Sequence, residues 1–207
     1  MAFPVVFQRS LFSTNGATDD EILELSRANP LFRFERSSDG EIIMSPPSGA
    51  ESGVQTAELN RQLGNWNREK GGGTLFDSQT GFTLPDGALL SPDAAWLAPG
   101  RFEALDRGTR KKFAPLCPDL VFEVLSPSDS IPATRRKIET YMRNGASCVV
   151  LLNPFDCSVE VSSREGDPKR LVDPARLTIP RRLLPGARGD LTLDLGDIFG
   201  DSRTQDG

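Results

Sequence analysis

Two acidic residues and one lysine occupy positions where side chains could do chemistry. Asp93 follows Pro92 at the start of an apolar run, and Glu123 lies in the middle of the apolar segment DLVFEVL. An unpaired carboxylate in a buried strand is costly, so Glu123 needs a charged partner or a metal ion. A salt bridge to a nearby arginine is the alternative to a metal site, because buried charges are usually paired.

Lys137 is the candidate cation. If residues 133–144 form a helix, Ile138 and Tyr141 belong to its inward stripe and Lys137 lies at the edge of that stripe. From there the lysine could reach along the sheet toward the end of the preceding strand. The alternative is a lysine whose amine extends into water.

The chain contains no histidine, which excludes several kinds of site. Ser-His-Asp and Cys-His pairs, histidine-based zinc sites and histidine-dependent nucleases cannot be formed. The chemistry must therefore use carboxylates, lysine, hydroxyls or a hard metal ion. The net charge of -5 argues against strong nonspecific binding of nucleic acid, so an enzyme acting on DNA would need a local basic surface.

The early elements are indicated by caps and turns. Thr18 and Glu21 form a capping box that predicts a helix over 19–28, and the Asp39-Gly40 pair predicts a hairpin between two short strands. A second helix is expected over 51–69. The three glycines at 71–73 end it and are not a phosphate loop, because no Gly-Lys-Ser/Thr follows.

The later elements predict a mixed α/β sheet flanked by helices, in a single domain over 18–200. The strand, helix, strand order around the 133–144 helix favours a parallel βαβ unit, whereas the early hairpin adds antiparallel strands. The Pro- and Arg-rich stretch 164–188 suggests loops and an edge strand. Strands are expected at 74–77, 81–84, 92–97, 119–125, 148–152 and 157–162, a last strand with a helical turn at 190–199, and tails at 1–17 and 201–207.

The remaining composition predicts a soluble cytoplasmic protein. No apolar run is long enough to cross a membrane, and the N-terminal segment lacks the features of a signal peptide. Cys117, Cys148 and Cys157 form no CxxC pair and suit reduced core thiols.

Several other polar residues suit structural positions. Asp119 is interpreted as a strand-end residue, and Asp77 and Asp86 lie beside turns, where aspartate is common. A hydrolase based on Ser126 and Lys137 has no nucleophile-elbow sequence to support it.

Several phrases of the chain resemble the Uma-two family of restriction endonucleases, within the PD-(D/E)xK superfamily. They are ERSSDGEIIMSPPS, LPDG, SPDAAW, PDLVFEVLSPSDS, the K-x3-Y of Lys137 and Tyr141, NGA, LLPG and DLTLDLGDIF. The resemblance covers about residues 18–200. It implies a restriction-endonuclease-like fold in which Asp93, Glu123 and the backbone carbonyl of Val124 bind Mg²⁺ or Mn²⁺, hard ions that prefer oxygen ligands.

The resemblance also assigns roles to two further residues, and the chain departs from the superfamily motif at one position. Leu125 stands where the general motif has lysine, so the catalytic cation is assigned to Lys137 on the next helix, and Glu58 is the candidate for a fourth carboxylate. A solvated Glu58 is the alternative. The implied activity is metal-dependent hydrolysis of DNA, by a homodimer if both strands are cut. The second reading is an inactive nuclease fold that serves as a binding or assembly module.

Overall fold

The structure, a computed structural model, describes residues 16–200. The predicted tails at 1–17 and 201–207 therefore lie outside the described residues, apart from Gly16 and Ala17. Within the described part of the chain, no helix is long and apolar enough to cross a membrane.

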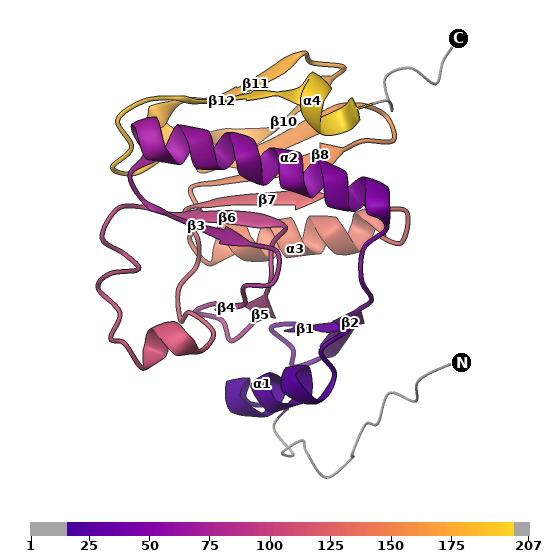
Figure 1. Cartoon of the computed structure of the whole chain (residues 1–207), viewed down its shortest axis with the longest axis vertical. Helices are drawn as coiled ribbons and strands as arrows, with labels where there is room; N and C mark the ends of the chain where they lie inside the picture. The colour runs from indigo at the N-terminus through magenta and orange to yellow at the C-terminus, as the bar shows by residue number, and fades with distance from the viewer. Residues whose placement is uncertain (1–15, 201–207) are drawn as a thin grey trace.

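A six-stranded mixed sheet forms the centre of the molecule (Figure 1). Strands β7 (Leu120–Val124) and β8 (Cys148–Asn153) are parallel and α3 (Ile131–Arg143) connects them, which confirms the predicted βαβ unit. All other neighbours in this sheet are antiparallel. In spatial order the strands are β10 (Gly166–Val172), β9 (Ser158–Ser163), β8 (Cys148–Asn153), β7 (Leu120–Val124), β6 (Ala94–Leu97) and β3 (Thr74–Asp77).

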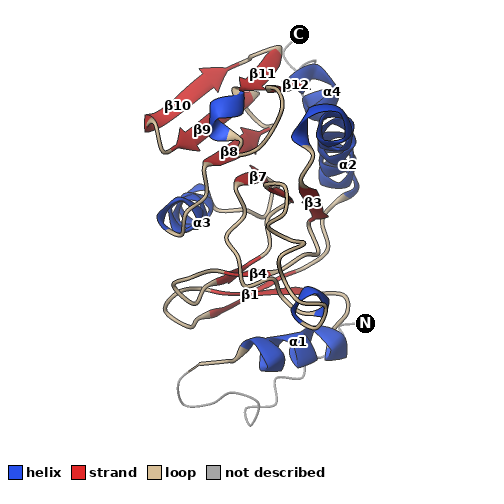
Figure 2. Cartoon of the chain, turned by 90° about the vertical axis from the view of Figure 1, so that its left-hand side faces the viewer, coloured by secondary structure: helices blue, strands red, loops and turns tan. Residues whose placement is uncertain are grey.

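Helices cover both faces of this sheet, with α2 (Ala50–Trp66) on one side and α3 on the other (Figure 2). The side chains of strand β7 pack against both helix layers. Leu120, Phe122 and Val124 belong to the core beneath α2, whereas Val121 belongs to the core beneath α3. Because side chains alternate along a strand, Glu123 faces the α3 side.

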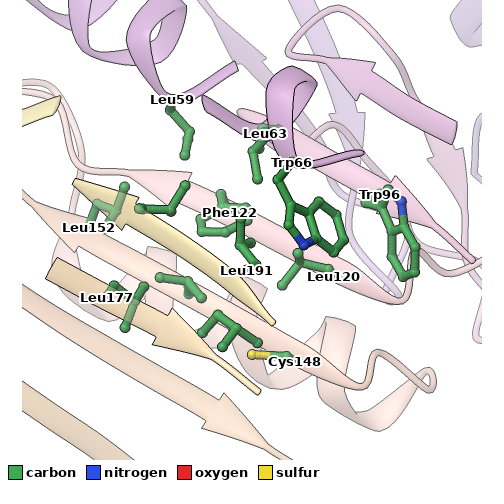
Figure 3. Close-up of a cluster of buried hydrophobic side chains, with 14 of the residues drawn as sticks. Leu59, Leu63, Trp66, Trp96, Leu120, Phe122, Cys148, Leu152, Leu177 and Leu191 are labelled. Carbon is green, nitrogen blue, oxygen red and sulfur yellow. The ribbon is translucent and has the colours of Figure 1, made fainter. Parts of the chain in front are cut away.

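The core beneath α2 also receives the C-terminal part of the chain. Strands β11 (Arg176–Ile179) and β12 (Leu191–Asp194) form a two-stranded sheet, followed by the short helix α4 (Leu195–Phe199). Figure 3 shows Leu177 and Leu191 of this sheet in one cluster with Leu59 of α2 and other labelled core residues. The predicted last strand and helical turn are confirmed.

A smaller four-stranded sheet, in the order β2-β1-β5-β4, lies at the other end of the molecule with α1 (Asp19–Ala28) beside it (Figure 1). Its strands are β1 (Arg33–Arg36), β2 (Ile42–Ser45), β4 (Phe82–Thr83) and β5 (Leu89–Leu90). The predicted hairpin is the β1–β2 pair, and the predicted capping box at α1 is present. The pairing of β1 with β5 was not predicted, and it brings the N-terminal hairpin to the segment that precedes β6.

Connecting segments complete the fold. A π-helical turn η2 (Asn67–Gly71) follows α2, and Gly72 adopts a positive φ of 70° after it, which suits a glycine. The helix predicted over 51–69 therefore begins at residue 50 and continues into this turn. Two 3₁₀ turns, η3 (Thr109–Lys111) and η4 (Arg181–Leu183), lie in the loops.

Candidate active site

Asp93 and Glu123 are neighbours across two antiparallel strands. The register pairs Ala94 with Phe122, and the Asp93 N–H donates to the Phe122 carbonyl at 3.1 Å. Continued by one position, this register sets Asp93 opposite Glu123. The Asp93 Oδ2 atom accepts a hydrogen bond of 2.8 Å from the Val124 N–H, which fixes the carboxylate against the end of β7.

Lys137 extends from α3 to Glu123. Its Nζ lies 2.9 Å from Glu123 Oε1 and 3.1 Å from Oε2, and it donates to the Ser91 carbonyl at 2.9 Å. The ammonium thus has a buried environment and does not extend into water. The partner of Glu123 is this lysine, whereas the sequence offered an arginine or a metal ion.

Glu35 of β1 is a third carboxylate at this place. Its Oε1 lies 3.0 Å from Lys137 Nζ and accepts a 2.6 Å hydrogen bond from the Ser91 N–H. Ser91 therefore holds Glu35 through its N–H and Lys137 through its carbonyl. This closed ring ties the small sheet, the segment before β6 and α3 together.

Arg33 and Tyr141 complete the cluster. Arg33 NH1 lies 3.6 Å from Asp93 Oδ1, and the charges of Arg33 and Glu123 both act on the pKa of Tyr141, which burial raises well above its ordinary value. Within residues 16–200, three buried side-chain nitrogen or oxygen atoms lack a hydrogen-bond partner, and all three belong here: Arg33 Nε, Glu123 Oε1 and the Tyr141 hydroxyl. Unmet buried polar atoms are rare and costly, so their gathering in one cluster makes it the candidate functional site.

The buried charges oppose one another in their effects on protonation. Burial raises the pKa of Glu123 to about 8; Lys137 opposes this rise, whereas Asp93 and Glu35 add to it. Burial also acts to raise the pKa of Glu35, but Lys137, Arg33 and the Ser91 N–H outweigh it and the pKa is lowered. Burial acts to lower the pKa of Lys137, yet Glu123 and Glu35 raise it, so the amine stays charged.

The donor set fits a hard, hydrated cation. Glu123 Oε1 has an ion pair with Lys137 at 2.9 Å but accepts no hydrogen bond, and Asp93 Oδ1 has the loose ion pair with Arg33. No group of three or more His, Cys, Asp or Glu side chains suitable for a metal occurs in the part of the chain that the structure describes. A fit therefore requires an ion such as Mg²⁺, which keeps several waters and takes one or two carboxylates together with substrate oxygens.

The comparisons agree with this architecture. The family model Uma2, described as a putative restriction endonuclease, matches residues 19–194, which is most of the chain. The chain belongs to the Uma2 family. A crystal structure described as a putative nuclease belonging to DUF820 from Anabaena variabilis ATCC 29413 superposes on this Uma2 protein with a TM-score of 0.72 and 20% identity, covering 89% of this chain and 98% of that chain. At this identity the likeness establishes the fold alone, a mixed sheet flanked by helices. The search of curated proteins found no match.

One residue expected at the site of this Uma2 protein lies elsewhere. Glu58 is on α2, which covers the sheet face opposite to Glu123, and it is bound by Arg61 at 2.5 Å and by Gln62 at 2.9 Å. The structure therefore does not bring Glu58 to the cluster, and the prediction of a fourth carboxylate from the early helix is corrected. The third carboxylate of the cluster is Glu35 of the β1–β2 hairpin.

The sequence held a weak signal for Glu35. Arg33 and Glu35 are two residues apart in a short strand, so they share one face. Phe34 and Glu35 are both buried, which means that both faces of β1 are covered. The burial of Glu35 follows from the pairing of β1 with β5, which the sequence does not reveal.

Among the other polar residues, the structural role expected for Asp119 is confirmed. Asp119 immediately precedes β7, and its Oδ2 accepts hydrogen bonds from the Ala98 N–H at 2.8 Å and from Arg101 NH1 at 2.6 Å. Asp129 accepts hydrogen bonds from Ser126 in the turn after β7. Cys117, Cys148 and Cys157 are free thiols, the first two buried.

Proposed function

We propose that this protein is a metal-dependent endonuclease that hydrolyses phosphodiester bonds of DNA at the Asp93–Glu123–Lys137 cluster. The observation that carries the proposal is the gathering of two carboxylates, one buried lysine and three unpartnered buried polar atoms at one end of the central sheet. Membership of the Uma2 family supports a nuclease.

Asp93, Glu123 and the Val124 carbonyl would hold Mg²⁺ or Mn²⁺. When bound, such an ion polarises the scissile phosphate and lowers the pKa of an attacking water. Asp93 Oδ2 already accepts the hydrogen bond from the Val124 N–H, so Oδ1, which has only the 3.6 Å ion pair with Arg33, would be the ligand atom. Glu123 would contribute Oε1, which accepts no hydrogen bond and which Lys137, 2.9 Å away, would share with the ion or release.

Lys137 would act on the attacking water or on the negative charge that develops at phosphorus. Glu35 and the Ser91 carbonyl fix its ammonium, at 3.0 and 2.9 Å, independently of Glu123. A charged group held in advance costs no reorganisation during the reaction. We therefore assign Glu35 as a positioning residue that acts through Lys137.

Cleavage of both strands of a duplex calls for two such sites. A symmetric homodimer would present them in opposite orientations, matching the two antiparallel strands. We propose this assembly for the cleaving form.

A binding or assembly module without activity is the second candidate, and one observation favours it. Lys137 uses its three donors on Glu35, Glu123 and Ser91, so the ion pairs are satisfied without any ion. In that case the cluster would stabilise the junction between the two larger sheets.

Thermal unfolding with Mn²⁺ separates the two candidates, because a ligand that binds only the folded state raises the melting temperature. The endonuclease predicts that Mn²⁺ raises the melting temperature of the wild type and not of Asp93→Ala. Equal responses of the two proteins, or none, would support the module.

A further inference from the structure

Arg33 is the least satisfied charged group of the cluster. Its loose ion pair with Asp93 spans 3.6 Å, and its NH1 reaches the Ser78 carbonyl only at 3.5 Å. The Nε atom is buried and has no hydrogen-bond partner. A guanidinium presents five donors in a planar fork, so the donor capacity of Arg33 is largely unused.

The net charge of the cluster indicates which kind of ligand would accept hydrogen bonds from Arg33. Arg33 and Lys137 face three carboxylates, Glu35, Asp93 and Glu123, which leaves one negative charge when all are ionised. A divalent cation would turn this into one positive charge, and a phosphodiester would then neutralise it. Binding of the anion is therefore coupled to binding of the cation.

We propose that Arg33 binds a phosphate oxygen of the substrate. In the absence of the metal ion, its guanidinium takes the place of that ion as the positive charge beside Asp93. This inference rests on the proposed function and names a further substrate-binding residue of that site. Arginine suits the task because its fork matches the tetrahedral oxygens of phosphate, whereas lysine offers a single point charge.

The position of Arg33 on the hairpin gives the inference a structural consequence. The N-terminal strand β1 then supplies both the residue that positions Lys137 and the residue that contacts the substrate. The small sheet is thus part of the binding surface.

The test uses Arg33→Met, with Arg27→Met as the matched control, because Arg27 is exposed on α1 outside the cluster and the same charge is removed. Mn²⁺ affinity is measured by electron paramagnetic resonance, and cleavage of a duplex oligonucleotide is followed at saturating Mn²⁺. Loss of the competing charge should tighten Mn²⁺ binding about fivefold, whereas cleavage should slow about tenfold or more. Arg27→Met should change neither.

Arg33→Lys provides the second variant if Arg33→Met does not fold. It keeps the charge and loses the fork, so Mn²⁺ affinity should stay near that of the wild type while cleavage slows. An active wild type with unchanged Mn²⁺ affinity and cleavage in these variants would overturn the role of Arg33 alone. A wild type that neither binds Mn²⁺ nor cleaves DNA would overturn the proposed function, and the phosphate-binding role with it.

Discussion

The ammonium of Lys137 lies 2.9 Å from Glu123 Oε1 although the two residues come from a helix and a strand 14 positions apart. Glu35 Oε1 lies 3.0 Å from the same ammonium. One buried lysine therefore compensates two buried carboxylates, and changes at any of the three should affect the other two.

Lys137→Ala should both destabilise the protein and abolish cleavage. Removing one partner of a buried ion pair costs roughly 3–5 kcal/mol, because the buried carboxylate of Glu35, whose pKa Lys137 helps to lower, stays behind without this counter-charge. Arg135→Ala, which breaks an exposed pair with Glu160, should instead weaken DNA binding with little effect on the cleavage rate. Chemical denaturation, single-turnover cleavage and a DNA titration at fixed salt measure the three quantities. Similar losses of DNA affinity in both variants would reduce Lys137 to part of a basic surface.

Glu123→Gln should remove a pH dependence of stability. The pKa of Glu123 is about 8 in the folded protein, against 4.5 ordinarily, so between these values the folded state binds more protons than the unfolded state. The free energy of unfolding of the wild type therefore falls as the pH rises from about 5 to 8, by a few kcal/mol for a shift of this size. The variant should match the wild type near pH 5 and exceed it near pH 8. A variant that unfolds at both pH values would identify a structural ion pair.

Glu35→Gln should lower the cleavage rate with little change in the KM for DNA, because Glu35 acts through Lys137. It should also leave a signature that a merely structural residue would not. Loss of the Glu35 charge removes one influence that raises the pKa of Glu123, so the fall of stability should occur at lower pH. Denaturation at several pH values checks the shift, and an unchanged profile would separate Glu35 from the network.

Tyr141→Phe should leave the metal-free protein as stable as the wild type or more stable. The hydroxyl is buried without a hydrogen-bond partner, and such a group costs about 1–3 kcal/mol. A loss of stability on removing the oxygen would mean that an ordered water satisfies it.

Local signals in the sequence predicted much of the fold. The capping box at Thr18, the Asp39-Gly40 turn and the apolar run around Glu123 each specify an element from a few adjacent residues, and the structure has all three. Glu123 was singled out for the same reason, since a charge in such a run is conspicuous.

The remaining features depend on contacts between distant segments. The pairing of β1 with β5 brings Glu35 close to Lys137, although about half of the chain separates the two residues in sequence. No periodicity in the sequence predicts this pairing. Glu58 is the candidate from the sequence because the family resemblance implies a carboxylate from an early helix. Its helix covers the other sheet face, which only the alternation of Phe122 and Glu123 in three dimensions reveals.

Cleavage of supercoiled plasmid DNA is the most direct test of the central claim, with wild type, Glu123→Gln and Glu58→Gln compared at equal folded concentration. The account predicts that the wild type and Glu58→Gln nick or linearise the plasmid only when Mg²⁺ or Mn²⁺ is present, whereas Glu123→Gln does not. Cleavage by Glu123→Gln at the wild-type rate, or no metal-dependent cleavage by the folded wild type, would contradict it.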